Sequence, residues 1–291
     1  MGGRSFESWR TSMILWRSTP TQLASAALKR SLAISAILRL LRMRLPSHAV
    51  IHLASVPGGA AEQNPTEAKR VNIDATMSLI EAAAATGIRP RFIFASSIAV
   101  FGDALPPQVD DDTPLAPRMV YGAHKAMMEA WIATQSRRGA IDGISLRLPG
   151  IVARPAGPSG MKSAFISDVF HAARARHDFT APVSADATMW LMSVDCIAAN
   201  IAHALTCPTE TAALTLPALR VRFGDLVRGI ALATGSDPAL VNYNPDLVLE
   251  AAFGNQPPLT TPAADTLGFH HDGNVTALIA SALATIESDS A

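Results

Sequence analysis

Glycine is almost absent from the beginning of this chain of 291 residues. Gly2 and Gly3 are followed by no other glycine until Gly58. A turn of the type Gly-x-x-Gly-x-x-Gly, which brings backbone N–H groups at a helix N-terminus close to a phosphate, cannot be written over this stretch. The absence excludes a phosphate-binding turn of that type in the first 57 residues.

Cysteine is also scarce. Cys196 and Cys207 lie eleven residues apart in the sequence, with no further cysteine to pair with. This excludes a disulfide framework and gives no support for a zinc site. We therefore expect no metal centre, and we expect a reducing compartment, the cytoplasm.

Long apolar runs are missing as well. In the segment formed by residues 1–47, the longest stretch without a charge is residues 18–28. It is shorter and more polar than the roughly 20 apolar residues that cross a membrane. We expect neither a transmembrane helix nor a membrane partner.

Charge is divided unevenly along the chain, although its formal total is zero. Residues 1–47 hold eight basic residues and one acidic residue, a formal charge of +7, and the remaining residues carry −7. On its own, a basic head of this kind is a candidate for contact with nucleic acid or a membrane surface. The rest of the chain leads to a different interpretation.

From Ser47 onward, short apolar runs rich in Val, Ile and Phe alternate with Ala-rich segments of helical length. This alternation predicts parallel βα units in an open, doubly wound sheet. Beyond residue 155 the pattern loosens and predicts a smaller lobe packed over the edge of the sheet. The predicted strands are 49–54, 91–95, 144–148 and 189–192, and the predicted helices are 72–86, 121–138, 165–176, 194–205, 222–234 and 275–286.

The segment Tyr121-Gly-Ala-His-Lys125 holds the sharpest chemical signal. A spacing of four on a helix puts both side chains on one face, where an ammonium favours ionisation of a phenol. A phenol with a lowered pKa can act as acid or base near neutral pH. Ser97 follows a predicted strand, where its hydroxyl can orient a substrate oxygen. Each feature alone also fits a solvated helix face or a turn; together they favour an acid/base site.

These segments together resemble the extended short-chain dehydrogenase/reductase family, which contains NAD-dependent epimerases, dehydratases and dehydrogenases. The resemblance covers residues 48–205 and implies a Rossmann-like doubly wound parallel sheet with a smaller C-terminal substrate lobe. The matching segments are Phe-Ile-Phe-Ala-Ser-Ser-Ile-Ala-Val-Phe-Gly at 92–102, the Tyr-Lys segment at 121–125, Leu-Arg-Leu-Pro at 146–149, His-Leu-Ala-Ser at 52–55 and Val-Asn-Ile-Asp-Ala-Thr at 71–76.

The resemblance implies a role for each residue of the site. Tyr121 would be the general acid/base that moves the hydroxyl proton. Lys125 would hold the nicotinamide ribose and lower the pKa of Tyr121, and Ser97 would orient the reacting oxygen. NAD is the expected cofactor, and NADP stays open because the residue that reads the ribose lies in a strand this sequence does not show. The expected cofactor-binding residues are Leu53, Ala54, Asn72, Ser96, Tyr121, Lys125 and Pro149.

The expected substrate is a small sugar acid such as D-erythronate. Within the family, the segments 99–102, 146–155 and 190–193 resemble dehydrogenases that oxidise such acids. Members that bind a nucleoside diphosphate commonly carry an Arg-Asp pair, which gives charge-assisted bidentate bonds, where this chain has Thr188-Met189.

The expected reaction is NAD-dependent oxidation of a secondary alcohol. Ser97, Tyr121 and Arg154 would contact this substrate, although Arg154 also fits a surface loop. The alternative is a nucleotide-sugar epimerase or dehydratase, and a homodimer is compatible with either.

Residues 1–47 do not match the family, which begins with a strand, a glycine-rich turn and a helix. Three interpretations are open for them: a targeting peptide, a basic amphipathic helix around 32–41, and coding sequence that is read out of frame or from a wrong start. We favour the third. The first strands of the sheet would then be missing or replaced, and strand 49–54 would form an unpaired hydrophobic edge of the sheet. A truncated, non-catalytic protein is therefore a further alternative. We divide the chain into an atypical basic segment (1–47), a partial Rossmann-like cofactor domain (48–155) and a mainly substrate-binding lobe (156–291), some of whose segments return to the first domain.

Overall fold

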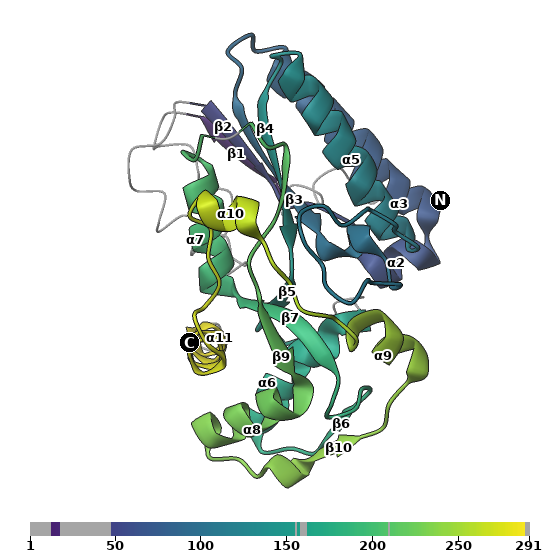
Figure 1. The fold of residues 1–291 in the computed structure, drawn as a ribbon, viewed down its shortest axis with the longest axis vertical. Coiled ribbons are helices and arrows are strands. Elements are labelled where there is room, and N and C mark those ends of the chain that lie inside the picture. The colour runs from purple at the N-terminus through teal and green to yellow at the C-terminus, as the bar shows by residue number, and fades with distance from the viewer. Residues whose placement is uncertain (1–12, 18–47, 155, 158–161, 209, 289–291) are drawn as a thin grey trace, which may run out of the picture.

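The computed structural model of this chain describes residues 13–17, 48–154, 156–157, 162–208 and 210–288. These residues form two lobes: a parallel sheet with its helices in the upper half of Figure 1, and a smaller lobe below it. Apart from residues 13–17, the segment 1–47 lies outside the described residues.

A sheet of five strands forms the centre of the upper lobe, in the order β1-β2-β3-β4-β8. The last four strands run parallel to one another. The strands predicted at 49–54, 91–95 and 144–148 correspond to β2, β3 and β4, so the α/β prediction with a parallel sheet is confirmed. The strands are β1 (Met13–Arg17), β2 (His48–His52), β3 (Arg91–Ser97), β4 (Asp142–Leu148) and β8 (Ala213–Thr215).

The expectation that the strand at 49–54 forms an unpaired edge of the sheet is wrong. β1 pairs with β2 in the antiparallel direction, with Met13 opposite His52 and Arg17 opposite His48. A strand from the basic N-terminal segment therefore occupies the edge at which unpaired N–H and C=O groups would otherwise be exposed.

Helices cover both faces of the sheet because alternate residues of a buried strand point to opposite sides. Val50 and Phe94 pack toward α4 and α5, whereas Ile51 and Ile93 pack toward α7. Figure 1 shows α5 and α7 on opposite sides of the strands. The helical elements of this lobe are α2 (Gly58–Gln63), α3 (Pro65–Lys69), η3 (Arg70–Ala75), α4 (Thr76–Ala84), η4 (Ile98–Phe101), α5 (Val120–Arg137), α7 (Val194–Ala204) and α10 (Pro262–Thr266).

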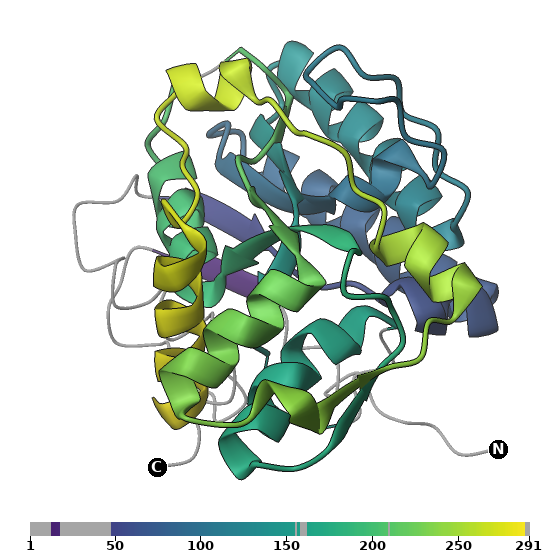
Figure 2. The same ribbon diagram turned by 60° about the horizontal axis from the view of Figure 1, so that its bottom comes forward.

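The lower lobe is built on a three-stranded sheet, β5-β7-β9, and a two-stranded sheet, β10-β6. Its apolar core lies among α6, α8 and α11, and Figure 2 shows α6 and α8 side by side. No helix in the described ranges is long and apolar enough to cross a membrane. The elements are β5 (Gly150–Val152), η5 (Lys162–Ala164), α6 (Phe165–Ala175), β6 (Phe179–Ala181), β7 (Thr188–Ser193), β9 (Leu219–Arg222), α8 (Phe223–Thr234), η6 (Pro238–Leu240), β10 (Val241–Tyr243), α9 (Leu247–Phe253) and α11 (Val275–Ser288).

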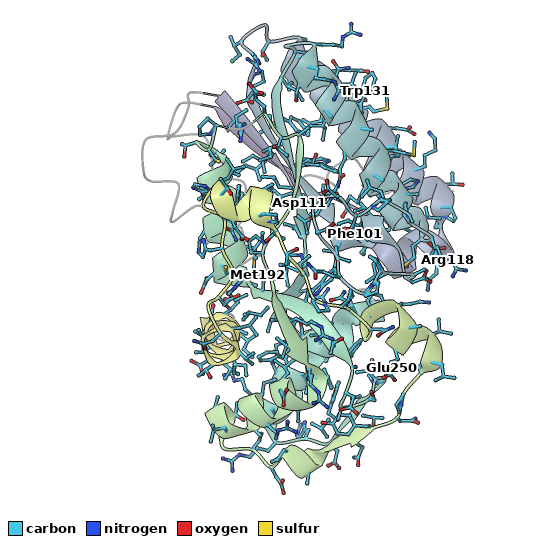
Figure 3. The ribbon with its side chains drawn as sticks, viewed as in Figure 1. Phe101, Asp111, Arg118, Trp131, Met192 and Glu250 are labelled. Atoms are coloured by element: carbon cyan, nitrogen blue, oxygen red, sulfur yellow. The ribbon has the colours of Figure 1, made fainter. Side chains whose placement is uncertain are left out.

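An aromatic contact joins the two lobes beside the carboxyl edge of the upper sheet. Trp190 of β7 is 1% exposed and packs against Val100 and Phe101 of η4. Phe101 is labelled in Figure 3 at the level where the lobes meet. The indole N–H of Trp190 donates to the Pro257 carbonyl at 2.7 Å. The lower lobe therefore fixes the segment that directly follows β3.

Candidate active site

Ser97 is the last residue of β3, at the edge where the parallel strands end. It pairs in register with Leu148 of β4. Its hydroxyl accepts a hydrogen bond from the Ala99 N–H at 3.2 Å, and this bond caps η4. Ser97 thus lies at the predicted strand end, with its hydroxyl held at the edge of the sheet.

The phenol of Tyr121 lies near the hydroxyls of Ser97 and Ser55, and both hydroxyls favour its ionised form. Tyr121 lies in the first turn of α5, and Ser55 lies in the loop after β2. Ser55 was not among the predicted site residues. The signal that points to it is the His-Leu-Ala-Ser segment directly after a strand, where the loops of an open parallel sheet meet a ligand.

A close approach of two backbones brings Tyr121 to Ser97. A Cβ atom added to Gly122 would lie 2.3 Å from the Ala99 carbonyl oxygen and 3.1 Å from the Pro117 Cβ. Only glycine lets the first turn of α5 pack this closely on η4, because any side chain would overlap that carbonyl. The glycine of the Tyr-Gly-Ala-His-Lys segment therefore has a structural role beside the two reactive residues.

Lys125 lies one turn after Tyr121 on the same face of α5, as the spacing of four predicts. Its side chain is buried, with 2% exposed. Nζ donates to the Ala95 carbonyl at 2.6 Å and lies 4.5 Å from the centroid of the Phe94 ring and 5.5 Å from that of Tyr121. The ammonium group is thus placed between the end of β3 and the phenol.

The expectation that the pKa of Tyr121 is lowered overall is wrong for the chain without cofactor. Burial raises the pKa of Tyr121 above its ordinary value, and the hydroxyls of Ser55 and Ser97 oppose this rise only in part. Burial also lowers the pKa of Lys125 from 10.5 to about 7, against the attraction of Glu129. Desolvation disfavours the charged form of both groups and outweighs the spacing on which the expectation rested.

Asn72 holds the loop that carries Ser55. Its Oδ1 accepts from the Val56 N–H at 2.7 Å, and its Nδ2 donates to the Val56 carbonyl at 3.1 Å. Asn72 is 3% exposed and belongs to η3, a π-helical segment that precedes α4 in the helix predicted at 72–86. Its amide thus acts on the loop, and a direct contact with a cofactor stays a prediction.

The other predicted cofactor residues are distributed around the same edge. Leu53 is partly buried and packs against the core beside α7, and Ala54 follows it in the loop after β2. Pro149 is buried between β4 and β5. Ser96 is 2% exposed, and its hydroxyl donates to Glu129 at 2.5 Å. This hydroxyl, predicted to contact the cofactor, is therefore directed to a carboxylate of α5.

Arg154 follows β5 and is held by the segment that begins α6. Nη2 donates to the Ser163 carbonyl at 3.1 Å, and the Arg154 backbone N–H donates to the Ser167 hydroxyl at 3.1 Å. Burial lowers the pKa of Arg154, and Asp168 opposes this effect. The structure brings Ser97, Tyr121 and Lys125 together and places Arg154 in the lower lobe.

The part of the chain that the structure describes contains no cluster of three or more His, Cys, Asp or Glu side chains that could hold a metal ion. Cys196 and Cys207 are buried and free.

Residues 23–212 match the sequence pattern of the NAD dependent epimerase/dehydratase family. The chain is 34% identical to D-erythronate dehydrogenase of Cupriavidus necator over 232 residues, which cover 78% of this chain and 72% of the relative. It is 38% identical to D-erythronate dehydrogenase of Haemophilus influenzae over 161 residues, 55% of this chain. That second match spans about half of the relative's length, 51%.

A solved structure has the same fold. The nucleoside-diphosphate-sugar epimerase from Agrobacterium tumefaciens aligns with a TM-score of 0.74 at 25% sequence identity. The alignment covers 91% of this chain and 81% of the epimerase. The arrangement of sheet and lower lobe is therefore shared over nearly the whole chain.

Proposed function

Because the chain belongs to the NAD-dependent epimerase/dehydratase family, we propose that it is a dehydrogenase that oxidises a secondary alcohol of a small sugar acid such as D-erythronate. The observation that carries the proposal is the phenol of Tyr121 beside the Ser97 hydroxyl, with Lys125 one helical turn away. These three groups lie where an open parallel sheet binds its ligand. The names of two relatives, both D-erythronate dehydrogenases, support the choice of substrate.

Each group has a defined part in the oxidation. Ser97 holds the substrate hydroxyl beside Tyr121, and the ionised phenol accepts the hydroxyl proton. The carbon that carries this hydroxyl loses a hydride as its oxygen becomes a carbonyl, and NAD supplies the hydride acceptor when bound. Lys125, as an ammonium, favours the phenolate through its positive charge.

The residues at the site fit the nicotinamide ribose. An ammonium has three donors, and the bond of Lys125 to the Ala95 carbonyl uses one of them. The remaining donors suit ribose hydroxyls.

The stretch between Gly3 and Gly58 contains no glycine, so it offers no glycine-rich turn to bind the pyrophosphate of NAD. Each hydrogen bond lost there costs about 1–3 kcal/mol, so we propose that the chain binds NAD weakly.

A small substrate fits the lower lobe better than a nucleotide sugar. Where relatives that bind a diphosphate carry an Arg-Asp pair, Met189 is 1% exposed and the Thr188 hydroxyl donates to the Gln256 carbonyl at 2.7 Å. Neither residue offers a cation for a diphosphate. We propose that Arg154 binds the substrate carboxylate.

The cytoplasmic location and the homodimer stay predictions.

The test is an activity panel with the purified chain. D-erythronate, other four-carbon sugar acids and UDP-sugars are each offered with NAD and with NADP, and the reduced nicotinamide is measured by absorbance while sugar products are separated by chromatography. The proposal expects cofactor reduction with a sugar acid and none with UDP-sugars. Conversion of a UDP-sugar without net reduction would establish an epimerase instead, and no reaction with any sugar acid would overturn the proposal.

A further inference from the structure

A buried carboxylate continues the row formed by Tyr121 and Lys125 on α5. Glu129 lies one turn beyond Lys125, and its side chain is 5% exposed. It accepts hydrogen bonds from Arg147, with Nη2 to Oε2 at 2.8 Å and Nε to Oε1 at 3.1 Å. It also accepts from the Ser96 hydroxyl at 2.5 Å. Phenol, ammonium and carboxylate therefore follow one another along a single helix face.

The partners of Glu129 come from two neighbouring strands. Ser96 on β3 and Arg147 on β4 are register partners, so they lie side by side under α5. Ser96 directly precedes Ser97 in the chain. One carboxylate thus ties the helix that carries Tyr121 and Lys125 to the strand that ends in the site serine.

The charged and titratable groups around Lys125 come from several elements. On α5 they are Tyr121 and Glu129, and β4 contributes Arg147 through its ion pair with Glu129. On β2, burial and the charge of Lys125 lower the pKa of His52 to about 3, so this imidazole is neutral. Its Nε2 lies 2.8 Å from the Thr76 hydroxyl. Glu129 therefore supplies the negative charge in these surroundings.

We propose that Glu129 is a positioning residue whose carboxylate fixes α5 against β3 and β4 and whose charge favours the ammonium form of Lys125. The use of this ammonium in catalysis rests on the proposed function, whereas the ion pair between Glu129 and Arg147 is independent of it.

A purely structural role predicts something different. A buried ion pair is often replaced by apolar residues of similar volume without loss of stability, so packing alone does not require a charge at this position. The carboxylate lies one turn from a buried ammonium, where burial favours the neutral amine. An opposite charge at that range favours the charged form. The charge of Glu129 thus has an effect on Lys125 that an apolar pair would not reproduce.

The test follows the titration of Lys125 in the free chain by carbon NMR of labelled lysine side chains. The sequence has four lysines, Lys29, Lys69, Lys125 and Lys162, so the signal is assigned with a Lys125→Met variant. Glu129→Gln keeps the shape and hydrogen-bonding atoms but removes the charge. The expected result is a Lys125 midpoint about one pH unit lower than in the unaltered chain. Glu81→Gln, an exposed change on α4, is the matched control and leaves the midpoint in place.

A second variant separates charge from packing, because Glu129→Gln leaves Arg147 as an unpaired buried charge. In the double variant Glu129→Gln with Arg147→Met both charges are removed, and the thermal unfolding midpoint returns toward that of the unaltered chain. Because Arg147→Met also removes a cation that disfavours the ammonium, the proposal expects the Lys125 midpoint of the folded double variant to lie between those of Glu129→Gln and the unaltered chain. A Lys125 midpoint equal to that of the unaltered chain in both Glu129→Gln and the double variant would overturn the proposal.

The activity arm tells failure of this inference from failure of the proposed function. If the unaltered chain reduces NAD, the double variant should lose activity at pH values where Lys125 has become neutral and recover part of it at lower pH. A double variant with an unshifted pH profile would contradict the role given to Glu129. If the unaltered chain is inactive, the proposed function fails, and the NMR midpoint still decides the effect of Glu129 on Lys125.

Discussion

Replacing Gly122 by alanine tests whether the close packing of α5 on η4 positions the reacting groups. The added Cβ would lie 2.3 Å from the Ala99 carbonyl oxygen. Ordinary contact needs about 3.4 Å, so the first turn of α5 must move by about 1 Å relative to η4. A misplacement of that size in a catalytic group can cost about 100-fold in rate. We expect kcat/KM to fall by roughly that factor.

The effect on stability is expected to be small by comparison. Alanine is favoured over glycine within a helix by about 1 kcal/mol, while overpacking costs about 1–3 kcal/mol. The net cost is therefore about 0–2 kcal/mol, less than the stability of a typical domain, so most of the population stays folded.

The assay compares kcat/KM for sugar-acid oxidation with the thermal unfolding midpoint in Gly122→Ala. Ala130→Gly, at an exposed position of the same helix, is the control and should lower the midpoint without changing kcat/KM. A Gly122→Ala chain with unchanged activity would refute the link between this packing and the geometry of Tyr121 and Ser97.

Three further predictions follow from the charges and contacts of the site. Oxidation requires ionised Tyr121, whose pKa burial raises, and protonated Lys125, whose pKa burial lowers to about 7, so its rate should pass through a maximum as pH rises; a rate independent of pH would contradict these roles. Lys125→Met should abolish turnover yet raise the free energy of unfolding by about 2 kcal/mol near pH 7. This increase in stability should shrink toward pH 10, because the Lys125 ammonium has a lower pKa in the folded chain than in the unfolded chain. Denaturant unfolding at several pH values measures the increase, and an increase that grows with pH would contradict the prediction. Asn72→Ala removes both hydrogen bonds to Val56 and should speed amide exchange in the loop that carries Ser55, measured by mass spectrometry, with protection of β3 as the reference that stays constant.

Local patterns were sufficient to predict β2, β3, β4 and α5 of the upper lobe. β3 has apolar residues on both faces, Phe94 toward α5 and Ile93 toward α7, and such a run is typical of a buried parallel strand. The helix predicted at 121–138 agrees with α5, which ends at Arg137. The spacing of Tyr121 and Lys125 also predicted their shared face, because the period of a helix depends only on the backbone.

Features that depend on distant partners could not be predicted in this way. Ser55 reaches Tyr121 only because the loop after β2 folds over the start of α5, and Asn72 holds that loop from η3. β1 pairs with β2 across 30 residues that no periodicity connects. The predicted direction of the shift in the pKa of Tyr121 was wrong, because the spacing shows only which groups are close, whereas burial depends on all the elements packed around them.

The role of Tyr121 as the acid/base is tested by the rate of NAD reduction by D-erythronate in the unaltered chain and in Tyr121→Phe. The substitution removes one hydroxyl, so circular dichroism and the heat of NAD binding should stay as they are in the unaltered chain. We expect measurable reduction in the unaltered chain and its loss in the folded Phe variant. A Phe variant that retains most of the activity would contradict the role assigned to Tyr121.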